Sequence, residues 1–222
     1  MIAPSSSAEF VAALEEVLEV YERAPGQCAA PGLPGRMHPT THPGGARTLA
    51  RRARAMRAPR IMNTNEGGVA AIFCAVAPHL GWRHLEERER KTRRDYAGFL
   101  RALCDEHFPA AERIVLVQDN LNTHSPASLY EAFPPAEAAR IKARFEFHFT
   151  PKHGSWMNIA EIELSVLTRG CLARRIPDRG TLAQELRAWQ RDRNQVAKGI
   201  RWQFTTADAR VKLIKLYPSP QK

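Results

Sequence analysis

The chain has 222 residues, enough for one well-buried domain with appendages but too few for two full domains. Its formal net charge of +10 favours a polyanionic partner, with nucleic acid as the leading candidate. No apolar run reaches transmembrane length and no signal-peptide pattern is present, so we expect a cytoplasmic protein without a membrane partner. The four cysteines are scattered and form no C-x-x-C pair, which argues against a zinc knuckle or a disulfide framework.

The first predicted element is an amphipathic helix within residues 1–23, ahead of the main domain. Ser6 stands three residues before Glu9, which is the spacing of a capping box. Large apolar residues follow at helical intervals from Phe10 to Tyr21. The helix is expected to end near Arg23.

Residues 24–66 differ in composition, and we predict that they form an irregular or disordered segment. Prolines and glycines alternate with arginines, and residues 24–60 contain neither Asp nor Glu. The segment has too few large apolar residues to offset the entropy lost on ordering. Its alanines and arginines are compatible with a short helix over residues 48–57, although that helix would have no apolar face.

Residues 67–222 return to an ordered pattern in which strands and helices alternate. We predict strands at Val69–Val76, Trp82–Glu89, Arg113–Gln118 and Phe145–Phe149, and helices from Tyr96 to Phe108, from Ser125 to Phe133, after Ser155, after a capping box at Thr181 and from Thr206 to Tyr217. The first of these strands is apolar throughout, as expected of a strand that is buried on both faces. This alternation predicts an α/β domain.

A carboxylate and several polar groups cluster where one apolar strand ends. Asp119 directly follows the strand that closes with Gln118, and Asn120 and His124 lie in the next loop. In open α/β sheets, functional sites form at the carboxyl ends of strands. An Asx turn at Asp119 would explain the same residues structurally, so both readings stay open on this motif alone.

A second cluster opens the helix that follows Ser155. At 100° per residue, Asn158 and Glu161 share one narrow polar stripe with Ser165 and Thr168, and apolar residues flank the stripe on both sides. We therefore expect a largely buried helix in which Glu161 needs a partner, either a metal ion or an arginine. Glu163 falls outside the stripe, which predicts a solvated or salt-bridged side chain.

Together, Asp119-Asn-x-x-x-His124 and Trp156-x-Asn158-x-x-Glu161 resemble the DDE endonuclease domain of mariner-superfamily insertion-sequence transposases. The resemblance covers roughly residues 67–218. It implies an RNase H-like mixed sheet flanked by helices, and two Mg²⁺ (or Mn²⁺) ions held by three carboxylates. It also implies metal-dependent DNA cleavage and strand transfer during bacterial DNA transposition and recombination. The implied partners are the transposon ends, the target DNA and a second copy of the chain, in a nucleoid-associated cytoplasmic protein.

The motif match also implies roles for individual residues. Asp119 and Glu161 would be the second and third catalytic and metal-binding carboxylates. The side chains of Asn120, His124 and Asn158 would orient these carboxylates or the substrate. Lys152 and His153 would contact the DNA phosphate backbone, the alternative being that they are merely solvated. Trp156 is expected in the core rather than as a base-stacking platform.

The chain departs from the family pattern at its first catalytic aspartate. The family places that residue at the end of an apolar central strand, between the opening helix and the strand matching Val69–Val76. Because residues 24–60 supply no acid and no apolar strand, we expect that the first central strand is lost and that this copy is inactive. The family's amino-terminal DNA-recognition region also has no counterpart, which predicts a truncated, pseudogene-like fragment. The alternative is a non-catalytic basic remnant that binds DNA non-specifically.

Overall fold

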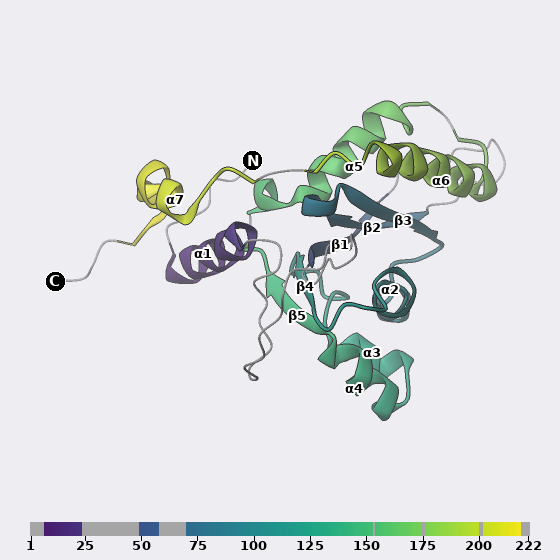
Figure 1. Ribbon diagram of the computed structural model, residues 1–222, viewed down its shortest axis with the longest axis horizontal. Helices are drawn as coiled ribbons and strands as arrows, with labels where there is room; N and C mark the ends of the chain where they lie inside the picture. Colours follow the sequence, from purple (N-terminus) through teal and green to yellow (C-terminus); the bar gives the residue numbers. More distant parts are fainter. Residues whose placement is uncertain are drawn as a thin grey trace, which may run out of the picture.

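The computed structural model describes residues 7–23, 49–57, 70–152, 154–174, 176–199 and 202–218, with the backbone alone for 49–57 (Figure 1). The helices and strands are α1 Ala8–Glu22, β1 Leu49–Arg57, β2 Ala71–Ala77, β3 Trp82–Arg88, α2 Arg93–Ala102, β4 Ile114–Gln118, α3 Ala127–Ala132, α4 Pro135–Ala143, β5 Phe145–Phe149, α5 Ile159–Gly170, α6 Arg179–Val196 and α7 Thr206–Lys212. Short helical turns lie at η1 Pro78–Leu80, η2 Leu103–His107, η3 Ser155–Met157 and η4 Ile214–Leu216.

One mixed sheet organises the fold, with strand order β3-β2-β1-β4-β5. The pairs β1–β4 and β4–β5 are parallel, whereas β2 runs antiparallel to both β1 and β3. Helices α5 and α6 lie over one side of the sheet and α2 lies on the other (Figure 1). The predicted α/β class is confirmed. Within the described ranges, no helix is long and apolar enough to cross a membrane.

The central strand lies inside the segment that we expected to be irregular. The backbone of β1 pairs with β2 from Arg52↔Val76 to Arg57↔Ala71 and with β4 from Leu49↔Ile114 to Arg51↔Leu116. The expectation that this strand is lost is therefore wrong, and the helix considered over residues 48–57 does not form. Two apolar neighbouring strands pair with its backbone from both sides, so tertiary pairing outweighs its weak local preference. The rest of residues 24–66 lies outside the described part of the chain.

Two hydrophobic clusters pack against the two faces of the sheet. Every residue of β2 is buried, as its apolar sequence predicted. Ile72, Cys74 and Val76 belong to the cluster that includes residues of α1, α5 and α6. Phe73 and Ala75 face the cluster that includes residues of α2 and α4. Because successive side chains of a strand point to opposite faces of the sheet, β2 contributes residues to both hydrophobic clusters.

Helix starts differ in detail from the sequence prediction. The side chain that caps α1 is Ser7, which accepts a hydrogen bond from the Phe10 N–H. Ser6, for which the capping box was predicted, lies outside the described residues. Helix α6 begins two residues before Thr181 because Asp178 caps it. Helix α4, which starts at Pro135 after the cap residue Pro134, was not predicted. Proline lacks only a donor that the first turn leaves unused, so it is compatible with a helix start.

Side chains of α6 form hydrogen bonds with the backbone of β3 at the outer edge of the sheet. The Asn194 Oδ1 accepts from the Arg83 N–H at 2.9 Å, while the Asn194 Nδ2 donates to the Arg83 carbonyl at 2.8 Å. The Gln190 Oε1 accepts from the Leu85 N–H at 2.7 Å. Backbone groups that an edge strand would present to solvent are therefore paired within the chain.

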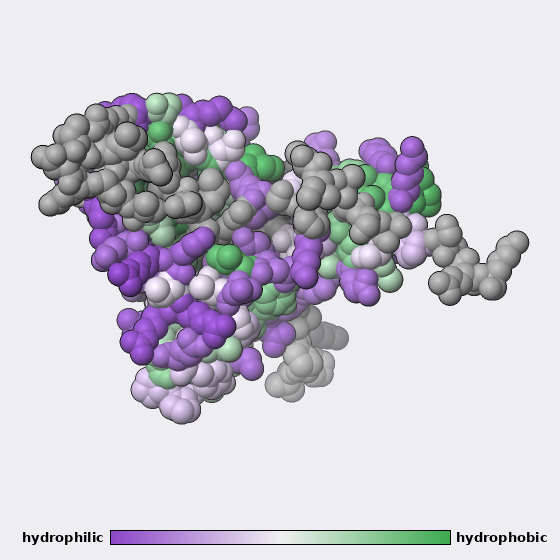
Figure 2. Space-filling model, turned by 180° about the vertical axis from the view of Figure 1, so that it is seen from behind, coloured by the Kyte–Doolittle hydropathy of each residue, from purple (hydrophilic) through white to green (hydrophobic). Residues whose placement is uncertain are grey.

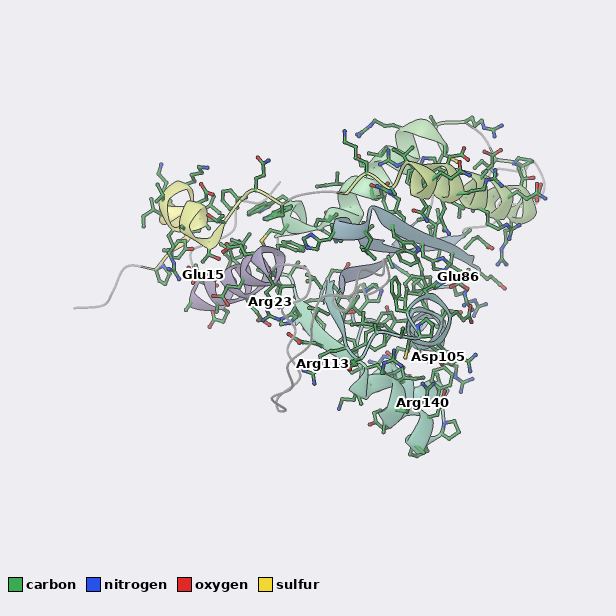
Figure 3. The ribbon with its side chains drawn as sticks, in the orientation of Figure 1. Glu15, Arg23, Glu86, Asp105, Arg113 and Arg140 are labelled. Carbon is green, nitrogen blue, oxygen red and sulfur yellow. The ribbon has the colours of Figure 1, made fainter. Side chains whose placement is uncertain are left out.

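Helix α1 joins the carboxyl-terminal segment to the sheet. Arg210 of α7 pairs with Glu15 at 2.8 Å, and Glu15 lies on the side of α1 toward α7 (Figure 3). At the other edge of the sheet, the His148 ring of β5 contacts Glu16 at 2.6 Å and Glu146 at 2.8 Å. Helix α1 thus contacts both α7 and β5.

Candidate functional site

Asp119 lies where β4 ends, and the structure brings it together with His124. The Asp119 side chain is 23% exposed, and its Oδ1 lies 2.6 Å from the Nδ1 of the fully buried His124 ring. A buried strand thus places a partly exposed carboxylate at its carboxyl end, as the sequence predicted. The resemblance implied that His124 orients the carboxylates or the substrate, and the structure places its ring against the Asp119 carboxylate.

Residues of α2 and β4 hold His124 through its ring and its backbone carbonyl, respectively. The Tyr96 ring stacks on it with centroids 4.7 Å apart, and the Gln118 Nε2 donates to the His124 carbonyl at 2.9 Å. The Tyr96 hydroxyl donates to the Gln118 Oε1. Burial raises the pKa of Tyr96, the hydrogen bond with Gln118 offsets part of that rise, and the negative charge of Asp119 adds to it, so the hydroxyl remains a donor. The His124 Nε2 is buried and has no hydrogen-bond partner among the described residues.

Asn120 attaches the loop after β5 to the end of β4. Its Nδ2 donates to the Thr150 carbonyl at 2.5 Å, and the Thr150 N–H donates to the Gln118 carbonyl at 2.8 Å. The loop that leads into α5 therefore starts beside the residue preceding Asp119. Asn120 acts on this loop and is itself exposed, so it does not contribute to the buried network around His124.

Glu161 occupies the first turn of α5, and Asn158 caps that turn. The Asn158 side chain is 2% exposed, and its Oδ1 accepts from the Glu161 N–H at 3.3 Å. Glu161 is partly exposed, in contrast to the buried position that we expected. The positive end of the helix dipole favours a carboxylate here. The structure thus places Asn158 and Glu161 of the second motif together in the first turn of α5, with Asn158 as the cap and Glu161 partly exposed.

Glu163 is a buried carboxylate of α5, and of the two alternatives predicted for it, solvated or salt-bridged, the structure shows the salt bridge. Its side chain is 3% exposed, and it pairs with Arg83 of β3 at 2.5 Å and with Arg193 of α6 at 2.9 Å. The alternative proposed for Glu161, a buried ion pair with arginine, therefore applies to Glu163. Spacing could have revealed this, because Glu163 shares an i, i+3, i+4, i+7 face with Ala160, Leu164 and Leu167. Ile162, expected beside a buried stripe, is 50% exposed.

Three further residues in the loop before α5 were candidates. Lys152 is exposed, as a phosphate contact requires, and His153 lies outside the described residues. Trp156 is 43% exposed, so the expectation of a core residue is wrong. Its ring meets Phe204 almost perpendicularly, with centroids 5.7 Å apart. The sequence carried no signal for this contact, since the two residues are far apart along the chain.

The described residues only partly fit a divalent metal site. Carboxylate oxygens such as those of Asp119 and Glu161 are suitable ligands for hard cations. Within the described ranges, however, no three His, Cys, Asp or Glu side chains are grouped so as to hold a metal ion. A two-metal centre with three carboxylates is therefore not assembled by these residues, and no chemical step through a metal is derived for them.

Comparisons with known proteins give one positive result. A family model described as DDE superfamily endonuclease matches residues 43–183. The matched region runs from ahead of β1 into α6 and includes both Asp119 and Glu161. A comparison with curated proteins gives no match.

Proposed function

We propose, because the chain belongs to the DDE superfamily endonuclease family, that it is a transposase-type catalytic domain that binds DNA but no longer cleaves it. Domains of this family generally act on DNA with the help of divalent metals. Assignment to insertion sequences of the mariner superfamily rests on the spacing of Asp119, His124, Asn158 and Glu161. The strand order supports an RNase H-like sheet with β1 at its centre.

The observation that carries the proposal is the register of β1. Its parallel pairing with β4 includes Arg51↔Leu116, and continuing this register residue by residue brings Arg54 level with Asp119. The antiparallel pairing also sets Arg54 opposite Cys74 of β2, a residue packed on the α5 side of the sheet. The family carries its first aspartate in this strand, whereas residues 49–57 contain no acid. The central strand is therefore retained, and we assign the position of the family's first carboxylate to Arg54.

The remaining groups support a site that is organised but incomplete. His124 contacts the Asp119 carboxylate, and the capped turn of α5 carries the partly exposed Glu161. These two carboxylates would be the ligands of Mg²⁺ or Mn²⁺. A third carboxylate is needed to hold the pair of ions on which in-line phosphodiester displacement depends in such sites.

DNA binding does not require the missing acid. The net charge of +10 and the exposed Lys152 beside α5 favour contacts with phosphates, with affinity that falls as salt rises. The second candidate function, a basic protein that binds DNA and has no organised catalytic site, shares this property. It differs in predicting that restoring an acid on β1 has no effect.

The experiment that tests the proposal is therefore a gain of function. Purified wild-type protein and the Arg54→Asp variant are incubated with supercoiled plasmid and Mn²⁺, and nicked product is quantified. We expect nicking by Arg54→Asp alone, and none when Asp119→Asn or Glu161→Gln is added to it. Arg57→Asp is the matched control, because it makes the same charge change at the end of the same strand.

Two results would contradict the proposal. Wild-type nicking that disappears in Asp119→Asn would show that the catalytic site is still active. If Arg54→Asp folds and binds DNA but does not nick it, the non-catalytic DNA-binding protein is the better description.

A further inference from the structure

An exposed aromatic pair lies at the start of the helix that carries Glu161. Trp156 belongs to the turn η3, two residues before the cap Asn158, and 43% of its surface is exposed. Tryptophan is highly buried on average, so a partly exposed indole beside a candidate active site is an uncommon feature. Phe204, which precedes α7, contacts this indole from a segment outside the family match.

The aromatic pair is supported on both of its chain segments. The Trp202 Nε1 donates to the Phe204 carbonyl at 2.7 Å, and the Trp202 ring packs on Tyr21 of α1 with centroids 4.9 Å apart. The Tyr21 hydroxyl donates to the carbonyl of Met157, the neighbour of Trp156, at 3.0 Å. Helix α1 thus fixes the backbone beside both rings. An aromatic surface held in this way loses little entropy when a ligand stacks on it.

Positive charge flanks the two rings. The Lys212 Nζ lies 5.6 Å from the centroid of the Phe204 ring, where Asp208 also holds it at 2.7 Å. Lys152 is exposed in the loop that leads to Trp156. Planar rings bordered by cations match the chemistry of a nucleotide strand, whose bases have π-faces and whose backbone is anionic.

We propose that Trp156, supported by Phe204, is a stacking platform for an unpaired nucleobase of the DNA strand that approaches α5. This inference rests on the proposed function and adds a substrate feature to it. The base must be unpaired, because neighbouring base pairs cover both faces of a base within a duplex. The net charge of +10 favours this occupant over an apolar peptide, which would gain nothing from the flanking lysines.

The test measures binding without catalysis, in buffer containing EDTA. The probes are a short oligothymidylate and an oligomer of equal length and charge in which every base is replaced by an abasic spacer. Wild-type protein should bind the first probe about 5- to 150-fold more tightly, the range expected for one base stacked on an aromatic side chain. Trp156→Ala should lose this discrimination, and Trp156→Phe should retain part of it.

A matched control and a second readout separate stacking from misfolding. Tyr130→Ala removes another exposed aromatic side chain, on α3, and should keep the full discrimination between probes. In the wild-type protein, stacking should quench part of the emission of the four tryptophans, and Trp156→Phe should remove that part of the quenching. Melting temperatures of all variants show whether each is folded.

Full discrimination by folded Trp156→Ala would overturn the platform, as would an equal loss in Tyr130→Ala. Neither result depends on cleavage, so the platform can fail while the nicking test on Arg54→Asp succeeds. Conversely, base-dependent binding through Trp156 would stand even if Arg54→Asp does not nick plasmid.

Discussion

Two glutamates of α5, Glu161 and Glu163, should differ in how much the same substitution to glutamine lowers the free energy of unfolding. In Glu163→Gln, the neutral amide no longer balances Arg83, whose side chain is only 4% exposed. Removing one partner of a buried ion pair costs about 3–5 kcal/mol, because the other charge stays buried without compensation. Arg193 also pairs with Glu163, but it is 40% exposed and can be solvated once the carboxylate is gone.

Glu161→Gln should lower the free energy of unfolding by less than Glu163→Gln does. Glu161 is partly exposed, and it places a negative charge at the positive end of a helix. That charge contributes about 0.3–1 kcal/mol. The same variant should abolish the nicking restored by Arg54→Asp, so the two glutamates separate a stability role from a catalytic one.

Urea denaturation followed by circular dichroism at neutral pH measures both variants on one scale, with the slope of the free energy against urea checked for constancy. Arg193→Ala is a useful comparison, because Arg193 is 40% exposed and Arg83 still balances Glu163 in this variant, so it should cost less than Glu163→Gln. The reasoning fails if Glu163→Gln costs less than about 1 kcal/mol or no more than Glu161→Gln. A further check is the double variant Arg83→Met/Glu163→Leu, which should recover most of the lost stability because no unpaired charge remains.

Other predictions address the turn between β2 and β3, the carboxyl-terminal helix and the edge of the sheet. Gly81→Ala should lower the unfolding free energy by about 1 kcal/mol or more, since φ is +59° and an added Cβ would lie 2.4 Å from the Ala197 backbone. Ala197→Gly should raise it by up to about 1 kcal/mol, because Ala197 has a φ of 45°. Urea midpoints of both variants check these two changes. Lys212, and next the groups of the helix cap, lower the pKa of Asp208 from 3.8 to about 2. The stabilising effect of Asp208 is therefore complete above pH 3.8 and is lost as the pH falls toward 2. The difference in stability between wild type and Asp208→Asn should vanish over this interval. A difference that stays constant with pH would refute the assignment. Asn194→Ala should cost about 1–3 kcal/mol, the net value of two hydrogen bonds, and an unchanged melting curve would contradict the edge role.

The strands that could be predicted from the sequence carry a recognisable local pattern. The continuous apolar run of β2 is buried throughout, and in β5 phenylalanines alternate with polar residues. The strand β1 could not be predicted, since its sequence of alanines and arginines favours no sheet position. It is specified by its two neighbours, and such pairing is not visible in a local window.

In the candidate site, too, contacts between residues close in the sequence could be predicted, whereas contacts between distant segments could not. Spacing alone related Asp119 to His124 and Asn158 to Glu161, because each pair lies within one loop or one helix turn. The contact of Trp156 with Phe204 joins segments distant in the sequence, so composition could only suggest that a tryptophan is buried. Glu163 is buried and Glu161 is partly exposed because of the side of α5 that packs against the sheet, and the polar stripe in the sequence did not indicate that side.

The amides that pair with the edge of β3 have a consequence for how the protein can be shortened. The family match ends at residue 183, whereas Gln190 and Asn194 lie further along α6. A fragment cut at that boundary would keep all five strands but leave the outer N–H groups of Arg83 and Leu85 open. An open strand edge is a template on which another chain can add a strand. The second half of α6 thus acts as an intramolecular cap against self-association, and the smallest soluble unit should extend to at least the end of that helix.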